Sequence, residues 1–392
     1  MRSWKSREWY LLMGATAVLF GVNLYGTIRG QNGNSDDFLL YAKFIDPIKL
    51  SGTITTPHFI YPMLVAVASM ILPSLSYTIL GAGIVLFFQL LLADVLWKCW
   101  NEVIPKSTWK LLAVALTLAV LTVAPVNLFT MSKHDMYFGY IGITVYHNPT
   151  IAICRPIALM HFVMFAKGLT GQKVTTRQIM YCFVTIVLAT LMKPNYATVI
   201  VPVAALYCVV PIYRKDYREF RFIATGTLLP GILVLGWQFL FTYTSGSGDM
   251  GQSHIIFAPL VVYANRSVHL FPKFILSTVF PLSVLMLYGK QVIKDRYCLM
   301  GILMFIAGAA QAYLLAESGS RMYDGNFLWS AQLGLFLWFF VSMRFVIMRF
   351  IKEPTTRHWS PGSIIVGVAF ALHLTSGIMW YVHETLSPGV YW

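Results

Sequence analysis

The chain has 392 residues, of which 57% are hydrophobic and only 11% are charged. A soluble protein of this length would expose far more charge, so the composition predicts an integral membrane protein. The formal net charge of +14 would suit a nucleic-acid partner, but the basic residues fall in short clusters between apolar stretches, as in membrane proteins. We therefore expect contact with membrane lipids and no nucleic-acid partner.

The apolar stretches predict an all-α polytopic protein with about eleven transmembrane helices. The first stretch follows a basic N-terminus and has no small-residue cleavage site, so we expect an uncleaved span and not a signal peptide. The predicted spans are 9–27, 77–97, 110–130, 150–167, 178–193, 196–213, 222–243, 272–289, 297–316, 328–348 and 361–382. The apolar stretch 57–72 is short and bounded by prolines. It would be a twelfth crossing or a re-entrant half-helix.

The positions of the basic residues decide between these two topologies. If the N-terminus is cytoplasmic and 57–72 does not cross, twenty of the 29 Lys and Arg residues lie in cytoplasmic segments. They are Arg2, Lys5, Arg7, Lys98, Lys106, Lys110, Lys167, Lys173, Arg177, Arg214, Lys215, Arg218, Arg221, Lys290, Lys294, Arg296, Arg344, Arg349, Lys352 and Arg357. A crossing at 57–72 would invert every later loop, so the positive-inside rule favours the half-helix.

This topology predicts a cytoplasmic N-terminus, an outer C-terminus and a location in the cell (inner) membrane. The polar groups of chemical interest then gather on the outer face. No repeat and no low-complexity linker interrupts the chain, so we expect one domain, 1–392, without a separate soluble domain.

The first outer loop carries two adjacent carboxylates, Asp36 and Asp37. Apolar and aromatic residues follow at helical spacing over 38–45, which predicts an amphipathic helix along the membrane surface. Such carboxylates can act as a general base toward a hydroxyl acceptor or hold a divalent cation. The alternative is a solvated helix start that is capped by Ser35 or Asp36.

The third outer loop carries a second polar group. Its candidate substrate-binding residues are His134, Asp135, Tyr146 and His147. A helix that begins near Pro149 would present backbone N–H groups to an anion, together with Arg155 one turn further on. The alternative is an aromatic belt at the membrane interface, although a belt does not account for Arg155.

Two basic residues lie at membrane depth, where an ionisable group is costly and usually faces a partner or ligand. Arg155 lies inside a predicted span, and Lys193 lies where two spans meet with almost no loop, beside Asn195. A lipid phosphate is a candidate partner for both cations. The alternative for Lys193 is a side chain that extends to the interface.

The segment 317–327 is a short, highly charged loop between two strongly apolar spans. Arg321 can bind a phosphate or pair with Glu317 or Asp324. The alternative is a capped turn between helices. A further segment, 254–269, predicts an amphipathic interfacial element that carries Arg266, next to a Gly/Ser-rich stretch.

Together these features resemble the GT-C superfamily of integral membrane glycosyltransferases. The resemblance rests on the acidic pair Asp36-Asp37 after one span, the interfacial helix, the stretch Pro57-His58-Phe59-Ile60-Tyr61-Pro62 and the alternation of basic inner with polar outer loops. It covers the first 170 residues well and the remainder only in architecture.

The resemblance implies transfer of a sugar from a polyprenyl-phosphate donor to a hydroxyl acceptor, a glycan or glycolipid, on the outer face. In that family the first-loop aspartate is the general base, which corresponds here to Asp36 or Asp37. For the donor phosphate we predict a single site formed by Arg155, Lys193 and Arg321, since three such cations would repel one another without an anion between them.

Two other functions remain open from the sequence. A lipid-linked glycan polymerase or ligase would rely on Arg155, His147 and Arg321 more than on the acidic pair. A transporter or flippase would show matching halves with broken helices at mid-membrane, and the halves here do not match. We expect no cofactor except a divalent cation at the acidic pair, if one is needed.

Overall fold

The computed structural model describes residues 6–29, 35–104, 109–127, 139–144, 146–170, 174–244, 253–353 and 360–386, with only the backbone described for Ser35, Asp36, Thr244 and Arg266. The helices and strands are α1 (Arg7–Ile28), α2 (Ser35–Ala42), α3 (Ile45–Ser51), α4 (Ile60–Ile71), α5 (Tyr77–Val103), α6 (Lys110–Thr122), α8 (Pro149–Gly168), α9 (Thr176–Met192), α10 (Pro194–Arg214), α11 (Tyr217–Ile223), η2 (Ala224–Leu228), α12 (Leu229–Thr244), β1 (Ile255–Phe257), α13 (Val261–Arg266), α14 (Leu270–Lys294), α15 (Arg296–Leu314), β2 (Leu315–Glu317), η4 (Gly319–Arg321), α16 (Leu328–Lys352) and α17 (Pro361–Leu386).

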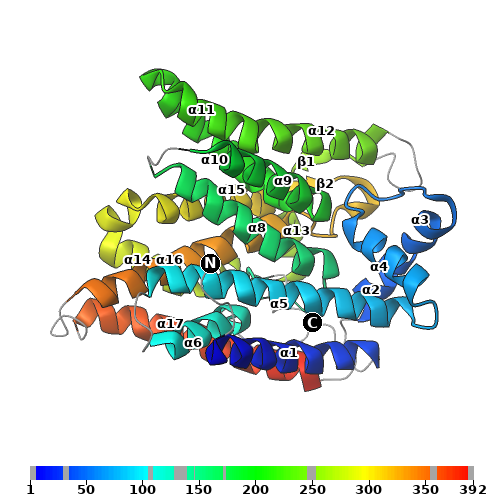
Figure 1. Ribbon diagram of the computed structural model, residues 1–392, viewed down its shortest axis with the longest axis horizontal. Coiled ribbons are helices and arrows are strands. Elements are labelled where there is room, and N and C mark those ends of the chain that lie inside the picture. Colours follow the sequence, from blue (N-terminus) through cyan, green and yellow to red (C-terminus); the bar gives the residue numbers. More distant parts are fainter. Residues whose placement is uncertain are drawn as a thin grey trace.

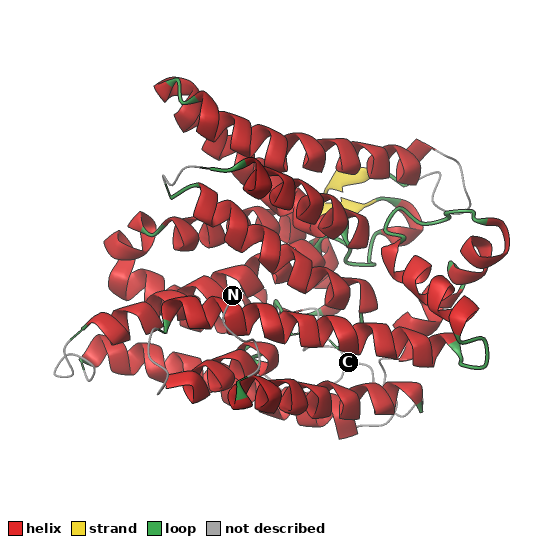
Figure 2. Cartoon of the chain, in the orientation of Figure 1, coloured by secondary structure: helices red, strands yellow, loops and turns green. Residues whose placement is uncertain are grey.

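The chain is an integral membrane protein and almost entirely helical (Figure 2). Within the described ranges, nine helices are long and apolar enough to cross a membrane. Every predicted span contains a helix, but those at 110–130 and 178–193 correspond to the shorter helices α6 and α9. Helix α4 has 12 residues, which gives a length of about 18 Å, well short of a hydrocarbon core of about 30 Å.

The long helices lie side by side and alternate in direction (Figure 1). Helices α2, α3 and α4 gather at one end of the bundle, which we call the α2–α4 end. The predicted basic loops that the structure describes lie at the opposite end, where α5, α8, α10, α14 and α16 finish. The polar residues that were predicted to act together can therefore gather at the α2–α4 end, away from the basic loops.

Helix α2 is held by the apolar face that its sequence predicts. Phe38 and Tyr41 of α2 are buried, as is Ile45, which begins α3 after a break in the helix predicted over 38–45. Leu39 and Leu40 are more than half exposed on the outside of the bundle. Two apolar surfaces, one against protein and one facing outward, suit a helix that lies along a membrane interface.

Helix α6 ends earlier than predicted. It stops at Thr122, and residues 123–127 continue in a non-helical path. The cause is local, because Pro125 disfavours a helical conformation at the residue before it. The backbone N–H groups that follow the helix bond to neighbouring helices instead: Ala124 N–H donates to the carbonyl of His373, and Val126 N–H donates to that of Leu276.

Helices α15 and α16 pack closely because glycines face the neighbouring backbone. A Cβ atom at Gly334 would lie 2.8 Å from the Met304 carbonyl oxygen, and one at Gly308 would overlap the backbone of Ser330. Small residues at a helix interface allow such close approach in membrane proteins. This contact fixes the rotation of α16, whose other face carries Trp329 and Phe336 toward the site described below.

The segment 254–269, predicted to be an amphipathic interfacial segment, forms two separate elements. Its beginning forms strand β1, which pairs antiparallel with β2, opposing Ile255 to Glu317 and Phe257 to Leu315. Only the short helix α13 follows. The pairing joins residues about sixty positions apart, so the local periodicity of either segment could not reveal it.

Candidate active site

A cavity of about 530 Å³ opens at the α2–α4 end, between the junction of α9 and α10, the helix α12 and the loop 317–327. Its lining is polar on one side and apolar on the other. The polar side includes His58, Lys193, Asn195, Glu317, Arg321 and Asn326, and the apolar side includes Ile232, Leu235 and Phe239 of α12. Four of the residues predicted from the sequence therefore share one cavity.

Lys193 is the single residue between α9 and α10. Met192 ends one helix and Pro194 begins the next, where proline is favoured because its missing N–H is not needed. The Lys193 side chain is buried, and its Nζ lies 4.9 Å from the centre of the Trp329 ring. It has no carboxylate partner among the residues that the structure describes.

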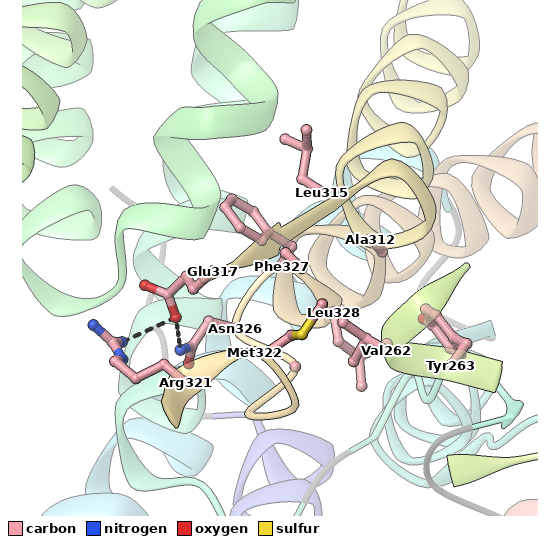
Figure 3. A pocket seen from close by; sticks show the side chains of 12 residues that line it. Val262, Tyr263, Ala312, Leu315, Glu317, Arg321, Met322, Asn326, Phe327 and Leu328 are labelled. Carbon is pink, nitrogen blue, oxygen red and sulfur yellow. Dashed lines mark hydrogen bonds and ion pairs between the residues drawn. The ribbon is translucent and has the colours of Figure 1, made fainter. Parts of the chain in front are cut away.

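Arg321 is held by acidic neighbours, as Figure 3 shows for Glu317. Its Nη2 lies 3.2 Å from Glu317 Oε2, and its Nε lies 3.6 Å from Asp324 Oδ2. Its Nη1 is buried and has no hydrogen-bond partner within the described ranges. Glu317 is buried and also accepts hydrogen bonds from the Tyr243 hydroxyl at 2.8 Å and from Asn326 Nδ2 at 2.5 Å.

Asn195 fixes the start of α10 against α16. Its Nδ2 donates to the backbone carbonyl of Asn326 and to Ser330 Oγ, each at 2.9 Å. These contacts tie the Lys193 junction to the loop that carries Arg321. Asn195 therefore positions the two sides of the cavity relative to one another.

Asp37 lies at the N-terminal end of α8. Its Oδ2 accepts a hydrogen bond from Asn148 Nδ2 at 3.0 Å and lies 4.0 Å from His147 Nε2. Asn148 also caps α8, because its Oδ1 accepts from the Ile151 N–H. The Asp37 side chain is 23% exposed, so its carboxylate can still be reached from outside the protein.

A chain of contacts leads from this carboxylate to the cavity. Thr150 Oγ1 donates to Asn148 Oδ1 at 2.7 Å, the Tyr41 hydroxyl lies 3.2 Å from Thr150 Oγ1, and the same hydroxyl lies 3.5 Å from His58 Nε2. His58 and Tyr41 were not among the predicted site residues. The only signal in the sequence was the position of His58 in the proline-flanked stretch before α4.

The ionisation of the site follows from burial. Burial lowers the pKa of Lys193 to about 8, with Asp37 opposing the shift. Lys193 lies between α9 and α10, outside both helices, and is still mainly protonated at neutral pH. Burial, followed by the charges of Lys193 and Arg321, lowers the pKa of His58 to about 3, so its imidazole is neutral. Burial also lowers the pKa of His147, and Asp37 counteracts this.

Arg155 lies apart from this cavity. It is buried in the second turn of α8, with its guanidinium carbon 4.4 Å from the centre of the Phe336 ring. The structure thus brings Lys193 and Arg321 to one cavity, pairs Arg321 with carboxylates and leaves Arg155 outside the lining. The three cations do not form the single site that was predicted, because loop carboxylates already neutralise one and another lies deeper in the bundle.

The other predicted residues divide into two groups. Tyr146 is buried between Phe20 and Tyr381, at ring-centroid distances of 6.2 and 6.0 Å. Predicted residues without a described side chain are His134, Asp135, Asp36 and Arg266, the first two of which lie outside the described residues. Within those ranges, no three His, Cys, Asp or Glu side chains gather in a way that could hold a metal ion.

Comparison with protein-family models, curated proteins and solved structures finds no match to this chain. The geometry of the site therefore carries the functional argument.

Proposed function

We propose that the chain is a membrane glycosyltransferase that moves a sugar from a polyprenyl-phosphate donor to a hydroxyl acceptor, a glycan or glycolipid. The observation that carries the proposal is the cavity beside α12, where an apolar helix face and a buried lysine that has no carboxylate partner among the described residues line the same space. A lipid phosphate has the matching division into a charged head and an apolar chain.

The donor phosphate would bind Lys193 and the free Nη1 of Arg321. His58, neutral and close to both charges, adds a hydrogen-bonding group without adding repulsion. The polyprenyl chain would follow the apolar side chains of α12 toward the lipid. Cations at the phosphate stabilise the negative charge that develops on the leaving oxygen as the glycosidic bond breaks.

Asp37 would act as the general base. It takes the proton of the acceptor hydroxyl while the hydroxyl oxygen attacks the anomeric carbon, and the polyprenyl phosphate leaves with the bonding electron pair. One such displacement inverts the anomeric configuration. Asn148 orients the carboxylate, and Asp36 is the adjacent carboxylate of the same helix.

The proposal is tested by a transfer assay. The purified chain in lipid nanodiscs is incubated with a panel of polyprenyl-phosphate-linked hexoses and pentoses that carry a radiolabel, together with a lipid extract as acceptor. We expect release of polyprenyl monophosphate and transfer of the label for one donor. Release of a polyprenyl diphosphate would instead identify a glycan polymerase or ligase, and no release from any donor would contradict the proposal.

We further propose that the α2–α4 end faces outward and the opposite, basic end faces the cytoplasm. Two exposed positions test this orientation in intact cells: Ser51→Cys at the α2–α4 end and Arg218→Cys at the opposite end. A membrane-impermeant thiol reagent should label the first and not the second. The reverse pattern would place the site on the cytoplasmic face and remove the outer-face assignment.

A further inference from the structure

Arg155 is a buried cation with no hydrogen-bond or carboxylate partner among the described residues. The residue is only 3% exposed. Its Nε, Nη1 and Nη2 all lack a hydrogen bond to the part of the chain that the structure describes. Its guanidinium carbon lies 4.4 Å from the centre of the Phe336 ring. A guanidinium carries five N–H donors, and an aromatic face satisfies none of them as a hydrogen-bond acceptor would.

Arg344, at the opposite end of the bundle, provides a matched comparison. Its guanidinium carbon lies 4.1 Å from the centre of the Tyr297 ring, and its Nη1 also lies 3.4 Å from Asp295 Oδ2. The two arginines share aromatic stacking, but only Arg344 has a carboxylate. A buried charge without a counter-charge is strongly destabilising, so its persistence calls for an explanation.

A second buried donor lies in the same region. The Tyr146 hydroxyl is buried and has no hydrogen-bond partner within the described ranges. Burial raises the pKa of Tyr146, the Glu384 carboxylate and Tyr381 raise it further, and the smaller effect of Arg155 opposes them. Tyr146 precedes α8 and Arg155 lies inside it, so two different segments supply the pair. Both groups can donate hydrogen bonds, and together they would satisfy an acceptor that carries negative charge.

Arg155 lies further along α8 than Asn148, the residue that binds the Asp37 carboxylate. Arg155 is seven residues after Asn148, which binds Asp37, and is therefore about 10 Å further along the axis of α8. Neither Arg155 nor Tyr146 lines the cavity assigned to the donor phosphate. A monophosphate donor has one phosphate, which the proposed function assigns to Lys193, so an anion at Arg155 would belong to the other substrate.

We propose that Arg155 and Tyr146 form a second anion-binding position, which holds a phosphate or carboxylate group of the acceptor. The inference rests on the proposed function, since it assigns the class of acceptor used at the same site. It predicts an acceptor whose anionic group lies within roughly 10 Å of the reacting hydroxyl.

Thermal unfolding of the full chain in an uncharged detergent tests the anion position without any activity measurement. In anion-free buffer, Arg155→Met should keep or raise the melting temperature, because a side chain of similar size replaces an unpaired buried charge. Arg344→Met should lower it, because Asp295 then loses its partner. A fall for Arg155→Met as large as that for Arg344→Met would overturn the inference.

Two probes then separate the two positions. Inorganic phosphate should stabilise Lys193→Met, and the double variant with Arg155→Met should need at least about tenfold more phosphate for the same stabilisation. Citronellyl phosphate, a short isoprenyl phosphate, should stabilise Arg155→Met and not Lys193→Met. Arg155→Lys should restore part of the phosphate response, since charge is kept and the planar fork is lost.

The outcomes distinguish the two claims. If the double variant responds to phosphate as Lys193→Met does, Arg155 binds no anion and the inference fails. If Arg155→Met removes the citronellyl phosphate response, the two positions are one site, and the inference fails while the proposed function stands. If only the Arg155-dependent phosphate response is seen, the anion position stands and the donor assignment fails. In the transfer assay, Arg155→Met should raise the half-saturating concentration of acceptor extract and not that of donor.

Discussion

The two ends of the bundle treat charge in opposite ways. At the end that lies opposite the α2–α4 end, basic side chains are paired or solvated, as in Lys98–Asp94, Lys167–Glu102, Arg344–Asp295 and Arg349–Glu353. Toward the α2–α4 end, Lys193 and Arg155 are buried against aromatic rings and have no carboxylate in the described residues. The first arrangement neutralises charge within the protein. The second leaves cations available to a ligand, which is the physical signature of a site.

The largest expected effect is that of the base. Asp37→Asn keeps the shape and the contact with Asn148 but removes the proton acceptor, so turnover in the transfer assay should fall by about 10²–10⁴-fold. Asp46→Asn, an exposed carboxylate on the neighbouring helix α3, is the matched control and should change turnover little. Full activity in Asp37→Asn, Asp36→Asn and the double variant would rule out the general-base role.

A pair of variants compares the two ends directly. Lys193→Met should lower kcat/KM for the donor by about 10- to 100-fold, the value of one hydrogen bond to a charged group, without loss of stability. Arg344→Met should show the converse: a loss of roughly 2 kcal/mol in the free energy of unfolding and unchanged activity per folded molecule. If both variants lost stability alike, the two ends would not differ as described.

Arg321 should behave between these two extremes, because carboxylates already hold it. Arg321→Lys keeps the charge, but its single ammonium group lacks the separate Nη1 that arginine offers to a phosphate while its other nitrogens contact Glu317 and Asp324. Donor kcat/KM should therefore fall by about fivefold. Glu317→Gln is the companion variant, since it tests whether the pairing positions Arg321. A loss for Arg321→Lys as large as that for Lys193→Met would mean that the phosphate rests mainly on Arg321.

Lys193 should also make donor use depend on pH. Lys193 loses its proton as the pH rises through about 8, so donor kcat/KM should fall by about tenfold from pH 7 to pH 9. The sign is fixed because deprotonation removes the charge that binds phosphate. Lys193→Arg stays charged over this range, and the fall should disappear in it. The same fall in Lys193→Arg would assign the titration to another group.

Much of the fold follows from local properties of the sequence. Apolar runs of sufficient length predicted every long helix. The two adjacent predicted spans on either side of Lys193 also predicted that this lysine lies at a helix junction. The apolar spacing of Phe38, Tyr41 and Ile45 predicted a helix next to the acidic pair, where the structure has α2 and α3. Each of these depends on residues within a few turns of one another, where periodicity and proline rules apply.

The parts that could not be predicted depend on contacts between distant segments. The partners of Arg321 were open alternatives in the sequence, and only the loop geometry selects Glu317 and Asp324. The contact between Tyr41 and His58 requires α2 to pack on the stretch before α4. Whether Arg155 faces the donor cavity depends on the rotation of α8 against α16, which no local pattern specifies.

The one-residue junction at Lys193 also constrains how the chain can vary. An α-helix turns by about 100° per residue, so inserting or deleting one residue there would rotate α10 by about that angle relative to α9. The face of α10 that carries Asn195 and Thr198 would then turn away from Ser330, and both hydrogen bonds to Ser330 would be lost. Length at this position is therefore as restricted as residue identity. We expect scanning insertions to be tolerated in the exposed turn around Gly52 and to abolish function at position 193, even where the protein still inserts into the membrane.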